Sequence, residues 1–420
     1  MGWLLTEKKR IALQRGGSLL AFIAAVGWLA SLPFSMAQQV RFTSIFLFAI
    51  LGAFLIQVLA GKQGFFRVGF RQFLRLLPMA LLALLPLLHF IPSGENQREL
   101  VLTAPLFLLP WILLWHNQED WFRFSRVSVL VLAASFFVLL GFLVGEGPLR
   151  VWHSVRSETE LPDVFLLARP QMGFLAGVVF FLLAGIFALQ KNTALFLFAA
   201  LTVLLLQFWI LSKIALGALL MALCYFLLRQ LKRKPMLLLV IVTFLLTAVI
   251  LLGSRIWQSG LVQDALSREG LSFQKYPKAY VNSINSRVVL WKAGFDVLRQ
   301  GDHFVIGMPS GELQEKLDAA VAVYNAYLTG QHLNPHNQFL YFFLHYGMAG
   351  VLVFLIFWLC VFRCSWHSPL LSAMWVFAFI CCQTEIFLDR EFGSQLYLFM
   401  LVYTLMSQDS AMNLKKPGHA

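Results

Sequence analysis

Long, uninterrupted runs of apolar residues restrict the fold of this 420-residue chain more than any other feature. A helix needs roughly 20 apolar residues to cross a bilayer, and the runs are continuous rather than alternating, which argues against a barrel. The sequence therefore predicts an all-α polytopic membrane helix bundle. Its spans, about twelve in all, lie near 16–36, 43–60, 74–92, 99–115, 127–145, 171–189, 193–211, 214–228, 236–253, 338–362, 369–388 and 393–407.

The composition and the charge pattern agree with a membrane protein. Only 13% of the residues are charged and 59% are hydrophobic, whereas soluble domains have about 25% charged residues. Basic residues collect before the first predicted span and after the second, eighth and last spans, which predicts that these loops and both termini are cytoplasmic. The net charge of +13 thus indicates topology and gives no reason to expect a nucleic-acid partner.

One long polar segment, residues 254–335, interrupts the apolar pattern between the ninth and tenth predicted spans. The alternation of loops places it outside the cytoplasm. Two stretches in it, Ser286–Arg299 and Gly311–Leu328, have the apolar period of amphipathic helices, which we expect on the membrane face or as a cap on the bundle. We find no linker, so we expect one integral membrane domain over residues 1–420.

His336 is the strongest candidate for acid–base chemistry, because it follows Pro335 at the outer boundary of the tenth predicted span. An imidazole can accept a proton near neutral pH, as a general base must. His332 lies four residues earlier, but Pro335 interrupts a continuous helix and no carboxylate is close in the sequence. We therefore expect no metal.

Three cations are expected at the same membrane face as His336. Lys213 lies between two apolar runs and either marks a turn or presents its charge to an anion. Arg287 is either a solvated residue or a guanidinium that binds phosphate oxygens, and Arg169 is a weaker candidate of the same kind. Together with a base, these cations suit a substrate that has a diphosphate and reacts with a hydroxyl group.

The motifs of nucleotide-driven enzymes are missing from the sequence. It has no phosphate-binding loop of the ATPase type and no Asp-x-Asp motif of a nucleotide-sugar metal site. We therefore expect no cofactor and no nucleotide, and a donor that arrives already activated from within the membrane.

The arrangement His336-Asn337-x9-Gly347-x2-Gly350 resembles the signature of the O-antigen ligase and polymerase superfamily of bacterial inner membranes. Two further segments are similar to that family: Ser286-Arg287-x3-Trp291 followed by Ile306-Gly307, and Ser212-Lys213-x3-Gly217. The family has an arginine where this chain has Lys213. Lysine keeps the charge but loses the bidentate fork.

The resemblance implies a C-type membrane glycosyltransferase that takes a glycan from undecaprenyl diphosphate at the periplasmic face, without metal or nucleotide. In a ligase the acceptor is a sugar hydroxyl of lipid A–core. His336 would deprotonate this hydroxyl, Arg287 and Lys213 would bind the diphosphate with help from Arg169, and the anomeric centre would invert. The resemblance assigns motif or structural positions to Asn337, Gly347, Gly350, Trp291 and Gly307.

Other functions stay open from the sequence. An O-antigen polymerase would use the same donor with another undecaprenyl-linked glycan as acceptor, and we favour the ligase over it. A protein O-oligosaccharyltransferase is less consistent with the short C-terminal tail. A transporter or flippase would need polar groups inside the bundle, where the predicted spans are almost uncharged. Glu385, Asp389 and Arg390, near the last outer turn, either form an ion pair or shape the site.

Overall fold

The computed structural model describes most of the helical parts of the chain. The described residues are 7–32, 42–59, 70–89, 118–145, 169–189, 202–203, 205, 213–230, 243, 283–300, 303–325, 328, 333–388 and 391–413. Every regular element among them is a helix. The elements are α1 (Glu7–Ser31), α2 (Phe42–Leu59), α3 (Phe70–Leu84), η4 (Leu85–His89), α5 (Gln118–Gly145), α7 (Arg169–Leu189), α9 (Lys213–Gln230), α12 (Ser283–Gln300), α13 (Ser310–Tyr324), α14 (Gln338–Ser365), α15 (Pro369–Cys382) and α16 (Glu391–Asn413).

The all-helical prediction is confirmed for the described residues, whereas the number of twelve spans is not. Two helical stretches there, Ile11–Ser31 and Gln338–Ser365, are long and apolar enough to cross a membrane, and six more apolar stretches are shorter. The predicted spans at 99–115, 193–211 and 236–253 lie wholly or almost wholly outside the described residues. The remaining predicted spans each contain a helix.

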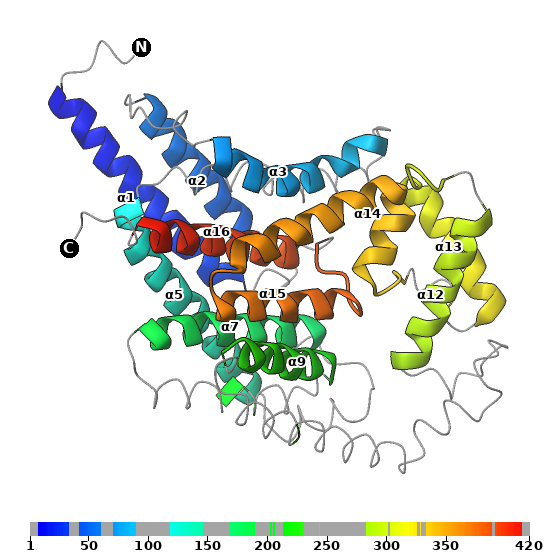
Figure 1. Cartoon of the computed structure of the whole chain (residues 1–420). Coiled ribbons are helices and arrows are strands. Elements are labelled where there is room, and N and C mark those ends of the chain that lie inside the picture. The colour runs from blue at the N-terminus through cyan, green and yellow to red at the C-terminus, as the bar shows by residue number, and fades with distance from the viewer. Residues whose placement is uncertain are drawn as a thin grey trace.

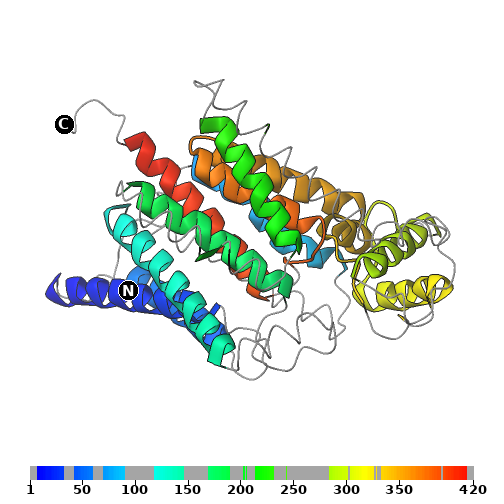
Figure 2. The same cartoon turned by 90° about the horizontal axis from the view of Figure 1, so that it is seen from below.

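The long helices lie side by side, with α12 and α13 at one end of the molecule (Figures 1 and 2). The start of α1 and the end of α16 lie at the opposite end in both views. Helices α7, α15 and α16 form the centre, since most of their described side chains are buried. The helices are apolar on every side, as expected for elements surrounded by other helices.

Close contacts and a few polar bonds hold the centre together. A Cβ atom on Gly177 of α7 would lie only 2.2 Å from the ring of Phe377 in α15, so this glycine lets the two helices approach. The indole of Trp375 donates a hydrogen bond of 3.0 Å to Thr404, which joins α15 to α16. This bond satisfies two polar groups, on Trp375 and Thr404, that are fully buried away from water.

Helix α14 is broken at Gly347, where the backbone is not helical (φ 61°, ψ −157°). Figure 1 shows its two arms meeting at an angle beside α12 and α13. The sequence predicted the helix but not the break. The short arm, residues 338–346, therefore turns away from the direction of the long arm, and His336 lies before the short arm.

The turn at residues 303–308, between α12 and α13, fits into the break of α14. Met348 and Ala349 donate backbone hydrogen bonds of 2.8 and 3.2 Å to the carbonyls of Phe304 and Val305. In return, Met308 donates one of 2.9 Å to the carbonyl of Leu344. The turn thus satisfies backbone groups that the break leaves without helical partners.

His89, at the end of η4, closes the same junction from a third element. Its Nε2 atom lies 2.7 Å from the carbonyl oxygen of His345 and 3.0 Å from that of Ile306. Both partners are acceptors, so Nε2 carries the hydrogen. The imidazole therefore joins α14 to the 303–308 turn.

Both stretches that were predicted to be amphipathic contain a helix, and the two helices pack on the short arm of α14 as a cap on one end of the bundle. The first runs over Ser283–Gln300, close to the predicted 286–299. The second ends at Tyr324 rather than at Leu328, because Asn325 has an extended backbone. Tyr324 donates a hydrogen bond to Asp296, which joins the two helices.

The predicted span at 369–388 is wrong in its last six residues. Helix α15 ends at Cys382, and residues 383–388 form a non-helical segment, which we call the 383–388 loop. The loop is nevertheless mostly buried, because its apolar side chains Ile386, Phe387 and Leu388 join the core. This loop brings Glu385 to the start of α14.

Candidate functional site

His336 occupies a strained backbone conformation just before α14. Its φ of 44° lies in the left-handed region, and among the described residues it is the one non-glycine with a positive φ. Such a conformation costs about 1–2 kcal/mol in an ordinary residue and often marks a functional site. Pro335 is buried, and the backbone amide of His336 donates a hydrogen bond of 3.1 Å to the side chain of Asn334. These neighbours hold the histidine in place.

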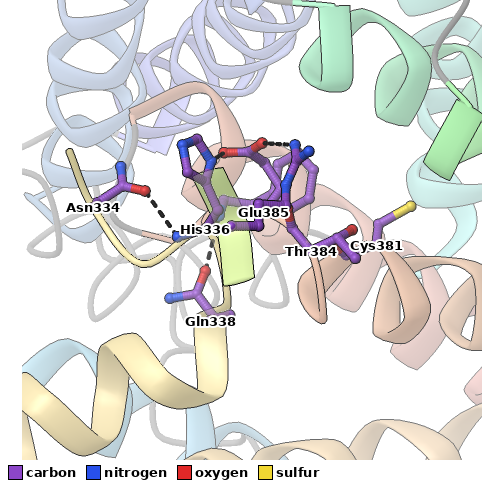
Figure 3. A network of polar contacts seen from close by, with 8 residues as sticks. Asn334, His336, Gln338, Cys381, Thr384 and Glu385 are labelled. Atoms are coloured by element: carbon purple, nitrogen blue, oxygen red, sulfur yellow. Dashed lines mark hydrogen bonds and ion pairs between the residues drawn. The ribbon is translucent and has the colours of Figure 1, made fainter. Parts of the chain in front are cut away.

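The imidazole of His336 faces the carboxylate of Glu385 (Figure 3). Its Nδ1 atom lies 3.0 Å from Oε1 of Glu385, whose side chain is only 8% exposed. A carboxylate can only accept hydrogen bonds, so Nδ1 carries the hydrogen. In the neutral ring, Nε2 then has the free electron pair and can accept a proton.

Arg287 reaches the same carboxylate from α12. Its Nη2 atom lies 3.6 Å from Oε2 of Glu385, and its Nε donates a hydrogen bond of 3.2 Å to the carbonyl of Thr384. Its side chain is 15% exposed. The ion pair is longer than a hydrogen bond, so it is mainly a charge interaction. Glu385 thus lies between the predicted base and the predicted phosphate ligand.

Asn337 and Gln338 fasten the 383–388 loop to the start of α14. Asn337 accepts a hydrogen bond of 3.0 Å from the amide of Leu340, which caps the helix, and donates one of 3.0 Å to the carbonyl of Gln383. The fully buried Gln338 accepts bonds of 2.8 and 3.0 Å from the amides of Phe387 and Leu388. The side-chain carbonyl oxygen of Gln338 points toward the 383–388 loop in Figure 3. The geometry around Glu385 is therefore fixed from both sides.

Lys213 and Arg169 are the first residues of α9 and α7, and both helices begin at the end of the bundle where Glu385 lies. At the other end, Arg229 of α9 donates a hydrogen bond of 2.9 Å to Ser372, in the first turn of α15, so α9 runs antiparallel to α15. Phe174 of α7 stacks on Phe387 with ring centres 4.3 Å apart. The side chains of Lys213 and Arg169 lie outside the described part of the structure.

The remaining motif residues have structural positions. Trp291 follows Arg287 by one helical turn and packs against the apolar cluster that contains Leu340 and Leu344 of α14. Gly307 and Gly347 face each other's backbones: a Cβ on Gly307 would lie 2.4 Å from the carbonyl of His345, and one on Gly347 would lie 2.4 Å from the carbonyl of Val305.

Gly350 allows a close approach one turn after the break in α14. A Cβ there would lie 2.5 Å from the Cβ of Tyr346 and 2.9 Å from the carbonyl of Phe342. Gly307, Gly347 and Gly350 thus allow α14 to break and the 303–308 turn to fit into the break.

Residues 198–355 match the family model described as O-antigen ligase. This match supports membership of the chain in the O-antigen ligase superfamily. Members of the O-antigen ligase superfamily are membrane-associated, glycosyltransferase-like enzymes of bacteria, either ligases or polymerases. Comparison with curated proteins finds no match.

The segment matched by the O-antigen ligase model contains His336, Arg287 and Lys213 but ends before Glu385. The sequence suggested no carboxylate partner for His336 and left the role of Glu385 open. Its one signal was an acid within the apolar run that was predicted as a span over 369–388. Asp389 and Arg390 lie outside the described residues. Among the described residues, there is no group of three or more His, Cys, Asp or Glu side chains that could hold a metal ion.

Proposed function

We propose that the protein is an O-antigen ligase that transfers an O-polysaccharide from undecaprenyl diphosphate to a sugar hydroxyl of lipid A–core. The observation that carries this proposal is the hydrogen bond of 3.0 Å between Nδ1 of His336 and the buried carboxylate of Glu385. It orients the imidazole and leaves Nε2 to act as a base. The family match supports the same class of reaction.

In the proposed reaction, Nε2 of His336 takes the proton from the acceptor hydroxyl. The acceptor oxygen forms a bond to the anomeric carbon of the donor glycan from the side opposite the diphosphate. The bond between that carbon and the phosphate oxygen breaks, and undecaprenyl diphosphate leaves with the electron pair. The anomeric configuration inverts. Glu385 stabilises the imidazolium that forms.

Cations near this end of the bundle would stabilise the departing diphosphate. Arg287 offers its guanidinium 3.6 Å from Glu385, and Lys213 and Arg169 begin helices at the same end. A guanidinium binds phosphate oxygens in two directions, and charges fixed in advance stabilise developing negative charge with little rearrangement. We assign Arg287 and Lys213 to the diphosphate, with Arg169 as an additional ligand.

We further propose that this end of the bundle faces the periplasm and that both termini are cytoplasmic, in a single integral membrane domain. The start of α1 and the end of α16 lie at the end opposite α12 and α13, which supports this orientation (Figure 1). The proposed periplasmic segment 254–335 contains both of those capping helices.

The test of the base is transfer by purified protein reconstituted with undecaprenyl-diphosphate-linked O-antigen and lipid A–core. We expect His336→Ala to abolish transfer, because the variant lacks the imidazole that takes the hydroxyl proton in the proposed reaction. Lys213→Arg should keep activity and Lys213→Ala should lose most of it. Normal turnover by His336→Ala would overturn the assignment of the base, and normal turnover by Lys213→Ala would reduce Lys213 to a turn residue.

The ligase is distinguished from the polymerase by the lipopolysaccharide of a deletion strain. A ligase deletion should leave core without O-antigen, with long polymer retained on the lipid carrier. A core that bears a single repeat would instead identify a polymerase, with His336 and Arg287 acting on a different acceptor. An unchanged lipopolysaccharide gel would contradict both functions.

A further inference from the structure

Two basic side chains, His336 and Arg287, contact Glu385, and they are held in different ways. Its Oε1 lies 3.0 Å from Nδ1 of His336, within hydrogen-bond distance, whereas its Oε2 lies 3.6 Å from Nη2 of Arg287. A hydrogen bond to a charged group is stronger than a looser charge pair. The pair with Arg287 is therefore the weaker of the two.

The partner that can move is Arg287. His336 and Glu385 are fastened together through Asn337 and Gln338, which bind the backbone of the 383–388 loop at Gln383, Phe387 and Leu388. Arg287 comes from α12, a separate element, and its Nε is attached to the carbonyl of Thr384. The guanidinium is a rigid plane, so when it turns to a ligand it gives up the 3.2 Å bond to Thr384 together with the 3.6 Å pair with Glu385.

An anionic ligand of Arg287 must compete with Glu385 for the guanidinium. A diphosphate offers several charged oxygens and can form two parallel hydrogen bonds with arginine, which the 3.6 Å pair does not. Once Arg287 turns to the diphosphate, its positive charge no longer neutralises the carboxylate of Glu385. The carboxylate then favours the imidazolium that proton transfer from the acceptor creates.

We propose that Glu385 is a positioning residue that holds Arg287 while the site is empty and releases it to the donor diphosphate, so that donor binding prepares His336 to accept the proton. This inference rests on the proposed function, in which Arg287 binds the diphosphate. It adds that the donor must bind before the acceptor hydroxyl is activated. It also predicts opposite effects of Glu385 on donor affinity and on turnover.

The first experiment measures binding of inorganic diphosphate and of a glycan-free polyprenyl diphosphate to the detergent-solubilised full chain, together with kcat for transfer. In Glu385→Gln we expect both diphosphates to bind about threefold to tenfold more tightly, because Arg287 has lost its competitor. We expect kcat to fall at least about tenfold, because the imidazolium has lost its carboxylate. A purely structural defect would weaken both binding and turnover.

Two further variants serve as controls. Glu385→Asp keeps the charge and should bind diphosphate within about twofold of the wild type. Glu312→Gln makes the same chemical change on α13, where Glu312 pairs with Lys316 at 2.6 Å, and should change neither binding nor turnover. In Arg287→Gln, adding Glu385→Gln should no longer tighten diphosphate binding, as a double-mutant cycle requires.

The results separate this inference from the proposed function. If Arg287→Gln weakens diphosphate binding but Glu385→Gln does not strengthen it, the exchange is overturned and the phosphate role of Arg287 stands. If Arg287→Gln leaves binding unchanged, both are overturned. A structure of the wild-type protein with inorganic diphosphate tests the exchange without any substitution. We expect Arg287 to lie more than 4 Å from Glu385 there, with His336 still paired, and an unchanged Arg287–Glu385 pair would refute the proposal.

Discussion

His336 combines the side chain of the proposed base with an unfavourable backbone conformation. Its φ of 44° is one that glycine adopts freely and that most L-residues avoid. The surrounding contacts of Pro335 and Asn334 hold this conformation, so the strain belongs to the position rather than to the imidazole. Stability and activity at residue 336 should therefore respond differently to substitution.

We expect His336→Gly to unfold with a free energy about 1 kcal/mol higher than that of His336→Ala, because glycine accepts a positive φ without steric cost. Both variants lack the base and should be inactive. His336→Asn should lie between them in stability, since asparagine tolerates this region better than alanine. Denaturation in detergent, with transfer assayed in parallel, provides the comparison. Equal stability of the glycine and alanine variants would argue against strain at this position.

The pH dependence of stability offers a second test at a single residue. The hydrogen bond from Lys316 lowers the pKa of Glu312 in α13, with the nearby charges of Lys316, His303 and His89 acting in the same direction. A carboxyl group with a lowered pKa stabilises the fold above its unfolded pKa, near 4.5, and loses this contribution as the pH falls through the folded value.

Glu312→Gln should therefore reduce stability slightly at neutral pH, by less than about 0.5 kcal/mol, because the pair is exposed and screened. The difference from the wild type should disappear as the pH falls below the lowered pKa of Glu312 in the folded protein. Thermal unfolding at several pH values, with Lys316→Met as the partner of a double-mutant cycle, measures the effect. A difference that persists at low pH would contradict the charge interaction.

The sequence predicted His336 and Arg287 as residues of the candidate site but did not predict that Glu385 lies between them. His336, Asn337 and Arg287 lie near recognisable boundaries of a polar segment, so their meeting could be expected from the pattern of spans. Glu385 follows His336 by 49 positions and lies in a stretch expected to be helical. Its role depends on where α15 ends, which is a matter of tertiary packing rather than of local sequence.

At the scale of elements, the break in α14 depends on backbone contact between two glycines and their opposing chains. Gly347 and Gly307 both have a positive φ, and a Cβ on either would lie 2.4 Å from backbone atoms. A backbone neighbour cannot move aside as a flexible side chain can. The sequence predicted the helix at 338–362, but a lone glycine within an apolar run is too common to indicate where it breaks.

We expect Gly347→Ala and Gly307→Ala each to destabilise the protein by at least about 3 kcal/mol, because strain in φ and a backbone clash add together. The junction of α14 with the 303–308 turn should open first. Hydrogen exchange at the amides of Met308 and Met348 reports on it directly. Gly141→Ala in α5 is the matched control, since a Cβ there meets nothing within 4 Å. Similar stability of all three variants would refute this account.

At the scale of the whole molecule, the candidate site and the ends of the described chain lie at opposite ends of the bundle (Figure 2). The basic residues of the sequence predict that both termini are cytoplasmic. The sequence could not predict how the helices pack, because runs that are apolar on every side carry little information about which neighbour they face. The orientation in the membrane can be tested by labelling from one side.

In a variant without its five native cysteines, Val323→Cys on α13 should react with a membrane-impermeant maleimide in intact spheroplasts. Val323 is 68% exposed, so the new thiol is accessible. Arg363→Cys, at the exposed end of α14, should react only after the membrane is permeabilised. The reverse pattern would show an inverted orientation, and equal labelling of both positions would contradict the proposed topology.

The way in which the 383–388 loop is held has a consequence for a saturation library of this region. Asn337 and Gln338 bind main-chain groups of the loop, so their bonds do not depend on the identity of Gln383 or Leu388. Position 385 differs, because its carboxylate itself makes the contacts with His336 and Arg287. Selection for O-antigen display should thus recover many substitutions at 383, while clones altered at 385, 337 or 338 should be lost.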